Sequence, residues 1–448
     1  MKLFFIVILL SLEFSIQKYL IFNLKKENYN SKQFNNNNFL KNEEVMENLL
    51  YNHYFTLINV GKPKKEIKFY ISFDNDKTIL TDNEFTKSHS ISYKYNLSTN
   101  ESIDIFGLND NNNKNYIIKN YHFCLLEYFQ KKETSHIQSI LGLKPTEEKN
   151  INNNMLFQLK NNRLINKRIF SYINIENSEN NLRKEILFIG ELPEVSNLNI
   201  KINNFPKDEI KWTKIGNINI YNGSEKWNIK IDSFYSNYNT TLSLNNTYIV
   251  FDLDYNLIIG PENFRNYLLD NFMNKLIDKE ICREDYFYDE INKKNYIYYI
   301  CSNIDDFQDQ IIYFRNDDLN ETFEFGLGDI FYRYNKNLFF GIIFVEEVKE
   351  GNNLNDINVW KFGKIFLEKY TIVYDDENKL IGYYKILKRN DNLYIIINSF
   401  IIFFCFVILF AFIGYKLRKK KKIRLEEKII KNCDKNEKEK EKEKEKND

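Results

Sequence analysis

The sequence predicts a mostly β protein built from two similar lobes. Its 448 residues are too many for one small core, and 43% of them are hydrophobic. Ile, Phe and Tyr dominate this apolar set, whereas the chain has only 14 glycines and 5 prolines, and β-branched and aromatic residues favour strands. A third observation is a repeated phrase, Tyr-Ile-Ser-Phe-Asp-Asn-Asp at 70–76 and Tyr-Ile-Val-Phe-Asp-Leu-Asp at 248–254. A duplicated lobe would carry such a phrase twice.

The N-terminal segment has the features of a targeting sequence. Residues 1–16 place a basic residue before a short apolar run, which is typical of a secretory signal peptide. Residues 17–49 include a polar stretch that is rich in asparagine and has no apolar period, so we expect a flexible leader or a short pro-segment there. The ordered body then begins near Leu50.

The body divides into an N-terminal β lobe over 50–205 and a C-terminal β lobe over 206–388. In the first lobe, the turn signal Gly61-Lys62-Pro63 joins two strand-like runs that lead into the first phrase. In the second, the phrase ends in Gly260-Pro261 and is followed by apolar residues at helical spacing over 262–276. Each lobe would present one carboxylate turn, so a pseudo-two-fold axis between the lobes would bring Asp74 and Asp252 together.

A second apolar run lies near the C-terminus. Residues 393–415 carry no charge and provide the roughly 20 residues that a transmembrane helix needs. The tail, 416–448, begins with a dense basic cluster, which the positive-inside rule places in the cytosol. A buried core helix is the alternative interpretation, and the flanking charges count against it. We therefore expect a single-pass type I membrane protein of the secretory pathway, with its bilobal body luminal or extracellular.

The cysteines fit an oxidising compartment. Cys282 and Cys301 flank one segment of the second lobe, and we expect a disulfide between them. Cys124 would then be a buried free thiol. Cys405 lies in the predicted membrane helix and Cys433 in the tail.

The stretch from Leu50 to Lys385 resembles the pepsin-like aspartic peptidases, including the plasmepsins. In the first half, residues 54–63 are similar to the family's first strand and its Gly-x-Pro turn, and Phe73-Asp74 lies at the first catalytic motif. Ile91-Ser92-Tyr93 lies at the position of the family's flap tyrosine, and Ile140-Leu141-Gly142-Leu143 follows the first active-site loop. In the second half, residues 249–261 lie at the second catalytic motif, and residues 359–367 and 370–375 resemble the closing segment.

The resemblance implies a bilobal pepsin-like fold with a pseudo-two-fold axis and a peptide-binding cleft between the lobes. In that family the residues at Asp74 and Asp252 form the catalytic dyad, and the residue at Tyr93 covers the bound substrate. The resemblance implies no cofactor and no metal. The net charge of +1 gives no indication of a nucleic-acid partner.

The two catalytic motifs depart from the family after their aspartates. Where the family has Asp-Thr-Gly followed by Ser or Thr, this chain has Asp74-Asn75-Asp76-Lys77 and Asp252-Leu253-Asp254-Tyr255. In the family the threonine links the two turns, and the glycine allows the backbone to approach the carboxylate closely. The hydroxyl at the fourth position donates to the aspartate. Two carboxylates share one proton only when held close together. The additional carboxylates of Asp76 and Asp254 would disturb that arrangement by charge repulsion, and the positive charge of Lys77 would offset one of them.

Three hypotheses follow from these residues. The preferred one is a membrane-anchored pepsin-like homologue that is catalytically impaired and binds a peptide or protein in the inter-lobe cleft. The alternative is an active aspartic endopeptidase that uses Asp74 and Asp252 as its dyad. A metal ion held by the clustered carboxylates is a weak third hypothesis, because Asp-x-Asp is a short and common pattern.

Overall fold

The computed structural model describes residues 19–26, 45–46, 49–51, 53–81, 85, 87–96, 101–109, 115–126, 138–146, 148–177, 182–193, 210–216, 225–236, 242–289, 293–303, 310–346, 357–384, 412, 415–417 and 428. Residues 1–386 belong to one compact unit and 387–448 to another. The predicted signal peptide and almost all of the predicted membrane helix and tail lie outside the described residues. Among the residues described, no helix has both the length and the hydropathy needed to cross a membrane.

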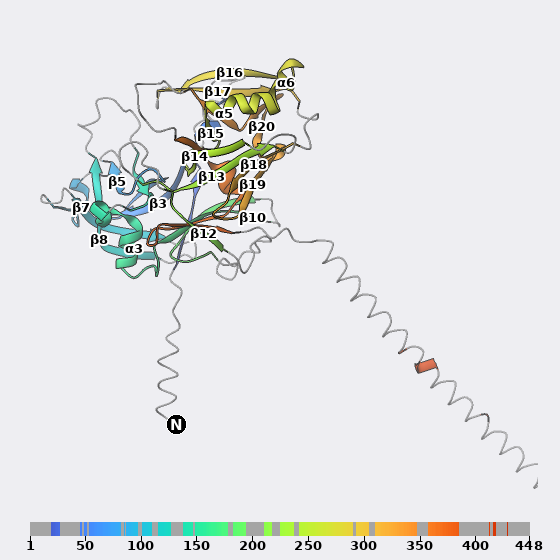
Figure 1. Cartoon of the computed structure of the whole chain (residues 1–448). Helices are drawn as coiled ribbons and strands as arrows, with labels where there is room; N and C mark the ends of the chain where they lie inside the picture. The colour runs from blue at the N-terminus through green and yellow to red at the C-terminus, as the bar shows by residue number, and fades with distance from the viewer. Residues whose placement is uncertain are drawn as a thin grey trace, which may run out of the picture. The chain divides into compact units, whose positions relative to one another are not determined.

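The fold is mostly β, as predicted (Figure 1). Most helical elements are short, but α5, η4 and α6 follow one another without a break from Asn263 to Asp278. This continuous helix lies where the sequence has apolar residues at helical spacing. The helical elements are η1 (Lys87–His89), η3 (Glu148–Asn153), α3 (Met155–Asn161), α5 (Asn263–Leu268), η4 (Leu269–Met273), α6 (Asn274–Asp278), α7 (Leu327–Ile330) and α8 (Lys364–Lys369).

The first half of the chain supplies an eight-stranded sheet. Its order is β2-β3-β4-β9-β5-β8-β7-β6, and an additional pairing of β3 with β7 closes most of it into a ring. The strands are β2 (Lys25–Lys26), β3 (Tyr54–Val60), β4 (Lys65–Ser72), β5 (Thr78–Thr81), β6 (Lys94–Asn96), β7 (Glu101–Asn109), β8 (Asn115–Leu126) and β9 (Ile140–Gly142).

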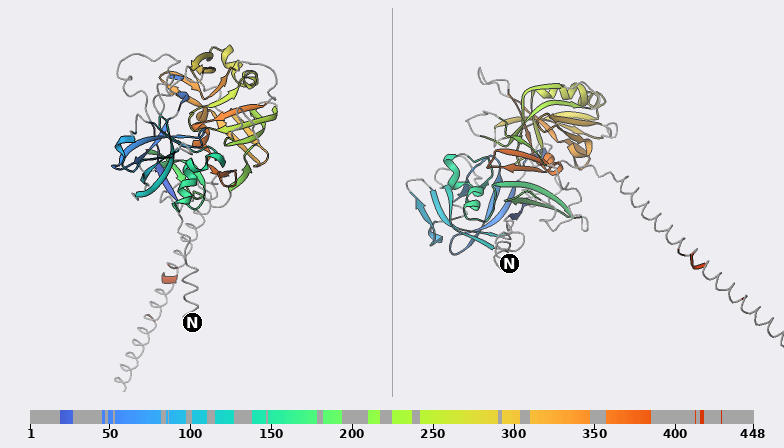
Figure 2. Two further views of the ribbon diagram at one scale, coloured as in Figure 1. Left: turned by 90° about the vertical axis from the view of Figure 1, so that its left-hand side faces the viewer. Right: turned by 60° about the horizontal axis from the view of Figure 1, so that its bottom comes forward.

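The second half supplies an eleven-stranded sheet in the order β19-β18-β13-β14-β23-β15-β22-β17-β21-β20, with β16 paired to β17. Its yellow and orange strands form a group separate from the blue and cyan strands of the first half (Figures 1 and 2). The strands are β13 (Asn228–Ser236), β14 (Leu242–Phe251), β15 (Ile258–Pro261), β16 (Cys282–Asp289), β17 (Lys294–Cys301), β18 (Ile311–Asn316), β19 (Glu321–Gly326), β20 (Phe331–Tyr334), β21 (Asn337–Phe340), β22 (Ile342–Val345) and β23 (Asn358–Phe362).

A six-stranded sheet draws strands from both halves. Its order is β1-β11-β10-β24-β25-β12, and the central pair, β10 with β24, is antiparallel. Each half of the chain contributes one single strand and one hairpin to this sheet. The first half contributes β1 and the β10–β11 hairpin, and the second half contributes β12 and the β24–β25 hairpin. The strands are β1 (Leu20–Asn23), β10 (Ile169–Asn177), β11 (Leu182–Ile189), β12 (Ile210–Lys214), β24 (Ile372–Asp375) and β25 (Leu380–Tyr384).

The same pairing pattern surrounds both copies of the repeated phrase. In the first half β4 is parallel to β9, β9 antiparallel to β5, and β5 parallel to β8. In the second half β14, β23, β15 and β22 repeat these relations in the same sequence. The phrase thus occupies the same place in two copies of one strand arrangement.

Part of the expected leader is built into the fold. Strand β1 forms the edge of the six-stranded sheet through pairing with β11, and Leu20 and Phe22 are buried in the core. The three consecutive apolar residues Leu20, Ile21 and Phe22 are buried on both faces of this short strand. Strands β1 and β2 therefore belong to the folded body, and the assignment of 17–49 to a flexible leader or a short pro-segment stays a prediction.

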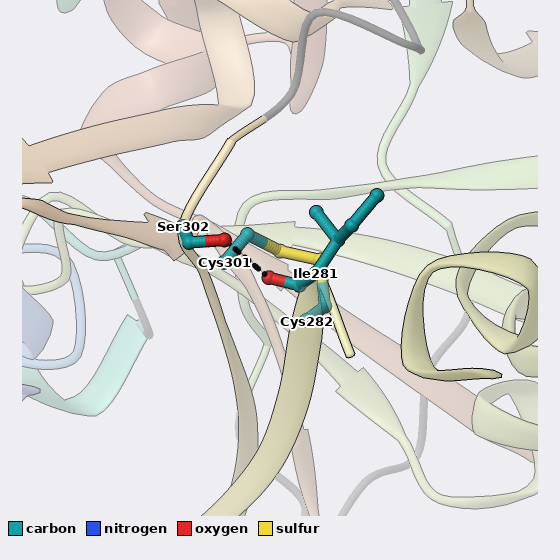
Figure 3. The surroundings of a disulfide bond; sticks show 4 residues. All are labelled: Ile281, Cys282, Cys301 and Ser302. Carbon is teal, nitrogen blue, oxygen red and sulfur yellow. Dashed lines mark hydrogen bonds between the residues drawn. A yellow bond between two sulfur atoms is a disulfide. The ribbon is translucent and has the colours of Figure 1, made fainter. Parts of the chain in front are cut away.

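The predicted disulfide is present. Cys282 and Cys301 lie opposite each other at the end of the β16–β17 hairpin, with their Cα atoms 4.0 Å apart (Figure 3). Ser302 closes the same end of the hairpin, since its backbone N–H and its hydroxyl both donate to the Ile281 carbonyl. Among the described cysteines, Cys124 is not in a disulfide and is half-buried rather than buried.

Removing this disulfide should destabilise the protein measurably. Cys301→Ser opens a loop with a sequence separation of 19 residues, so the free energy of unfolding should fall by about 3 kcal/mol. Urea unfolding of the oxidised protein measures this change, with Cys124→Ser as the control. An equal unfolding midpoint for the Cys301→Ser variant and the unsubstituted protein would show that the bridge contributes little.

Candidate functional site

Both predicted aspartates begin a turn at the end of a strand of the repeated arrangement: Asp252 follows β14 directly, and one residue separates Asp74 from β4. Asp74 begins the first turn, defined as residues 74–77, and Asp252 begins the second turn, residues 252–255. A glycine packs on each turn: a Cβ on Gly142 would lie 2.5 Å from the Asn75 carbonyl oxygen, and one on Gly363 would clash with the Tyr255 carbonyl oxygen. Glycine is therefore needed at both places because backbone approaches backbone there.

The phenylalanine of each phrase explains why the phrase is repeated. Phe73 and Phe251 are both buried and both pack against the ring of Tyr374, with ring centroids 5.2 and 6.0 Å away. Tyr374 belongs to β24, in the six-stranded sheet that the two halves share. One tyrosine thus contacts the phenylalanine that precedes each aspartate, and it ties the bases of the two turns to one strand.

Asp74 forms an ion pair with a lysine of the other half. The Lys226 Nζ atom lies 2.7 Å from an Asp74 carboxylate oxygen, and 39% of the Asp74 side chain is exposed. Lys226 is anchored by its neighbour Trp227, whose indole N–H donates to the Leu143 carbonyl at 2.6 Å. Desolvation alone would raise the pKa of Asp74, but Lys226 and Lys361 outweigh it and lower that pKa.

Asp252 is buried and has a different lysine. Lys361, on β23, places its Nζ atom 3.5 Å from the Asp252 carboxylate, whose side chain is 1% exposed. The same ammonium lies over the Tyr255 ring, 4.5 Å from its centroid. Burial would lower the pKa of Lys361, but Asp252 and Asp74 raise it, so this lysine stays charged.

The two aspartates belong to one electrostatic cluster. Burial raises the pKa of Asp252, Lys361 opposes the increase, and the charge of Asp74 adds to it. The pKa values of the two carboxyls therefore move in opposite directions, down for Asp74 and up for Asp252. The structure thus brings together the two residues that the sequence singled out, with each carboxylate beside a lysine.

The second turn supplies a third carboxyl, and a serine links it to the first turn. The Ser72 hydroxyl donates to Asp254 at 3.3 Å and accepts from the Asp74 backbone N–H at 3.2 Å. The Asp254 backbone N–H in turn donates to Asp252 at 3.1 Å. Asp76 has the corresponding position in the first turn, and its backbone carbonyl accepts from the side chain of Asn154.

Residues just before β3 contact the second turn. The Asn256 backbone N–H donates to the Leu50 carbonyl and its side-chain amide donates to the Tyr51 carbonyl, both at 2.8 Å. Tyr51 also forms a β-bridge with Tyr255. The start of the predicted first lobe is therefore packed against the candidate site of the second half.

Tyr93 is placed in the first half by contacts of its own. Its hydroxyl lies 3.0 Å from the Ser102 hydroxyl, and its ring packs against Phe85. None of these contacts joins it to Asp74 or Asp252. Its assignment to substrate binding therefore stays a prediction.

Ser72, Lys226 and Lys361 also contact the carboxyls of the site, and no sequence pattern identified them. A signal existed for Lys361, because it interrupts the apolar run Val359-Trp360-Lys361-Phe362. Lys226 and Ser72 carry no such signal. Within the described ranges, no three His, Cys, Asp or Glu side chains are grouped so that they could hold a metal ion.

Comparison with known proteins supports the fold alone. No family model and no curated protein matches this sequence. Among solved structures, the chain is similar to conglutin gamma, described as a unique basic 7S globulin from lupine seeds, with a TM-score of 0.56 and 10% sequence identity over 82% of this chain and 95% of that one. At this identity the similarity concerns the arrangement of the strands and not the chemistry of the site.

Proposed function

We propose that this chain is a membrane-anchored, bilobal protein of the pepsin-like type that binds a peptide or protein ligand between its two halves and has little or no peptidase activity. The observation that carries the proposal is that Asp74 pairs with Lys226 and Asp252 with Lys361. The repeated strand arrangement and the shared six-stranded sheet support the bilobal, two-fold part of the proposal.

The lysine pairs oppose the chemistry of an aspartic peptidase. In that chemistry two close carboxyls share one proton, so that one acts as acid and the other as base toward water. An ammonium beside each carboxyl favours the ionised form, and at Asp74 it lowers the pKa, whereas at Asp252 Lys361 only partly offsets the increase caused by burial. Both lysines thus reduce the need for a shared proton. The turns also lack the hydroxyl donors and glycines of the family motif, and loss of such supporting groups commonly removes catalytic geometry.

A peptidase assay of the full chain in detergent micelles tests this proposal. At acidic pH, with a mixed peptide library, we expect no cleavage above that of an Asp74→Ala, Asp252→Ala double variant. Crosslinking of the same library to the unsubstituted protein should exceed crosslinking to a variant with Trp227→Ala, because Trp227 anchors Lys226. Turnover that disappears in either aspartate variant would establish the peptidase instead.

One observation favours that alternative, an active aspartic endopeptidase. The pKa values of Asp74 and Asp252 are displaced in opposite directions, and such separation is how paired carboxyls divide acid and base roles. In this case Asp252 would be the acid and Asp74 the base.

The membrane anchorage and the secretory route are part of the same proposal. They rest on the apolar run at 393–415, the basic start of the tail at 416–448 and the targeting features of residues 1–16. Protease treatment of sealed microsomes should remove the tail and spare the body if the body is luminal. Loss of the body with survival of the tail would reverse the proposed topology.

A further inference from the structure

The β18–β19 hairpin (Figure 1) ends in an exposed turn that carries Asn320. The Asn320 backbone N–H donates to the Asp317 carbonyl at 3.0 Å, and its φ of 48° lies in the left-handed region. Asparagine adopts this conformation more readily than most residues, so the turn by itself accounts for an asparagine here. The turn makes no such demand on the residue two positions later, which is a threonine. Asn320-Glu321-Thr322 is thus an acceptor sequence for N-linked glycosylation.

The side-chain amide of Asn320 is open to modification at its nitrogen. Its Oδ1 atom accepts from the Arg315 guanidinium at 3.4 Å, and among the described residues no hydrogen bond involves its Nδ2 atom. The Asn320 backbone carbonyl accepts from the Lys211 Nζ atom at 3.4 Å. A group attached to Nδ2 would therefore displace none of these contacts.

Another acceptor sequence of the described residues, Asn245-Asn246-Thr247, is placed differently. It lies in β14, which pairs with β13 on one side and with β23 on the other. The Thr247 side chain is buried, and its hydroxyl donates to the Asn245 carbonyl at 3.2 Å. Thr322, by contrast, is half-buried on an end strand of its sheet. The Asn320 sequence is therefore accessible both before and after the chain folds.

Asn320 lies where the edges of two sheets meet. Within the described residues, β19 is an end strand of the eleven-stranded sheet and β12 an end strand of the six-stranded sheet. Lys211, on β12, forms an ion pair with Glu321, on β19, at 2.6 Å, and its neighbour Trp212 is 37% exposed. Exposed strand edges favour pairing between chains, and natural proteins cover them. A hydrophilic group on Asn320 would cover both edges.

We propose that Asn320 carries an N-linked oligosaccharide that covers the edges of β12 and β19. The donor is an oligosaccharide that is linked through pyrophosphate to a membrane lipid. The Nδ2 atom of Asn320 bonds to the anomeric carbon of the first sugar, the bond from that carbon to the pyrophosphate breaks, and the nitrogen loses one proton. The inference rests on the luminal or extracellular body of the proposed function, because secreted domains are the ones that receive this modification.

Glycopeptide mapping of the full chain, expressed in eukaryotic cells that glycosylate secretory proteins, tests the inference. Peptide:N-glycosidase in heavy-oxygen water converts each glycosylated asparagine to a mass-labelled aspartate, and we expect the label at Asn320 in most molecules. Asn335 is an internal control, because it is also exposed in a hairpin turn, with a φ of 53°. It is followed by Lys336-Asn337 and is not an acceptor sequence, so it should stay unlabelled.

Three variants separate failure of the inference from failure of the proposed topology. Thr322→Ala removes the hydroxyl of the acceptor sequence and should abolish the label at Asn320, whereas Thr322→Ser should keep it. Asn337→Thr creates an acceptor sequence at Asn335, in the same half of the chain. Label at Asn335 in that variant without label at Asn320 would overturn the inference and leave the topology standing. If neither asparagine is labelled, the inference is overturned, and the microsome experiment then shows whether the topology fails with it.

The same pair of variants at Thr322 tests the covering of the strand edges. Size-exclusion chromatography of the full chain in detergent micelles should show a larger oligomeric fraction for Thr322→Ala than for Thr322→Ser, because only the latter keeps the oligosaccharide. Equal oligomeric fractions for the two variants would overturn the covering role.

Discussion

Replacing Lys361 with leucine should lower the free energy of unfolding by about 3 kcal/mol at neutral pH. The substitution leaves Asp252, whose side chain is 1% exposed, without its lysine, and an uncompensated buried charge typically costs about 3–5 kcal/mol. We expect the lower end of that range because the Asp254 backbone N–H still donates to Asp252. Urea unfolding at pH 7 measures the loss.

The other lysine provides a matched control. Lys226→Leu breaks the ion pair with Asp74, which is 39% exposed, and exposed pairs contribute about 1 kcal/mol or less. The double variant Lys361→Leu, Asp252→Asn should recover most of the stability lost by Lys361→Leu alone, because no buried charge then remains. Equal losses for Lys361→Leu and Lys226→Leu would contradict the assignment of Lys361 as the partner of a buried carboxylate.

The loss should also depend on pH. Without Lys361 the pKa of Asp252, already raised by burial, rises further, so folding of the variant is favoured by protonation. The variant should therefore approach the stability of the unsubstituted protein as pH falls and Asp252 takes up its proton. A loss that is the same at pH 4 and pH 7 would point to lost packing over Tyr255 as its cause.

Restoring both family motifs and removing the lysines should produce peptidase activity at acidic pH. Positioned acid–base groups contribute about 10²–10⁴ in rate, so cleavage should rise at least about a hundredfold over the unsubstituted protein. The substitutions are Asn75→Thr, Asp76→Gly, Lys77→Ser, Leu253→Thr, Asp254→Gly and Tyr255→Thr, together with Lys226→Met and Lys361→Leu. Initial rates on a quenched peptide library measure the gain, after circular dichroism has confirmed folding.

Two comparisons separate the causes of that gain. The same variant with Asp74→Ala should return to background, because the dyad is then incomplete. A variant with the six turn substitutions and both lysines retained should stay near background if the ion pairs suppress catalysis. Equal activity with and without Lys226 and Lys361 would mean that the lysines do not hold the site inactive.

Local sequence predicted several parts of this protein. The β-branched and aromatic composition predicted a mostly β fold, because these side chains suit a pleated, half-buried surface. The disulfide followed from two cysteines flanking one short segment, and both joined residues now lie opposite each other on one hairpin. The repeated phrase identified Asp74 and Asp252 because the same seven-residue pattern ends a strand in each half.

Tertiary structure alone decided which charges surround those aspartates. Lys226 is 152 residues from Asp74 and Lys361 is 109 residues from Asp252, so no local pattern joins either pair. Strand order and register position the two ammonium groups. Lys361 is positioned by the parallel pairing of β23 with β14, and Lys226 by the hydrogen bond of its neighbour Trp227 to the Leu143 carbonyl. The sequence determined where the carboxylates are, whereas packing between distant strands determined their charge partners and therefore which chemistry they can perform.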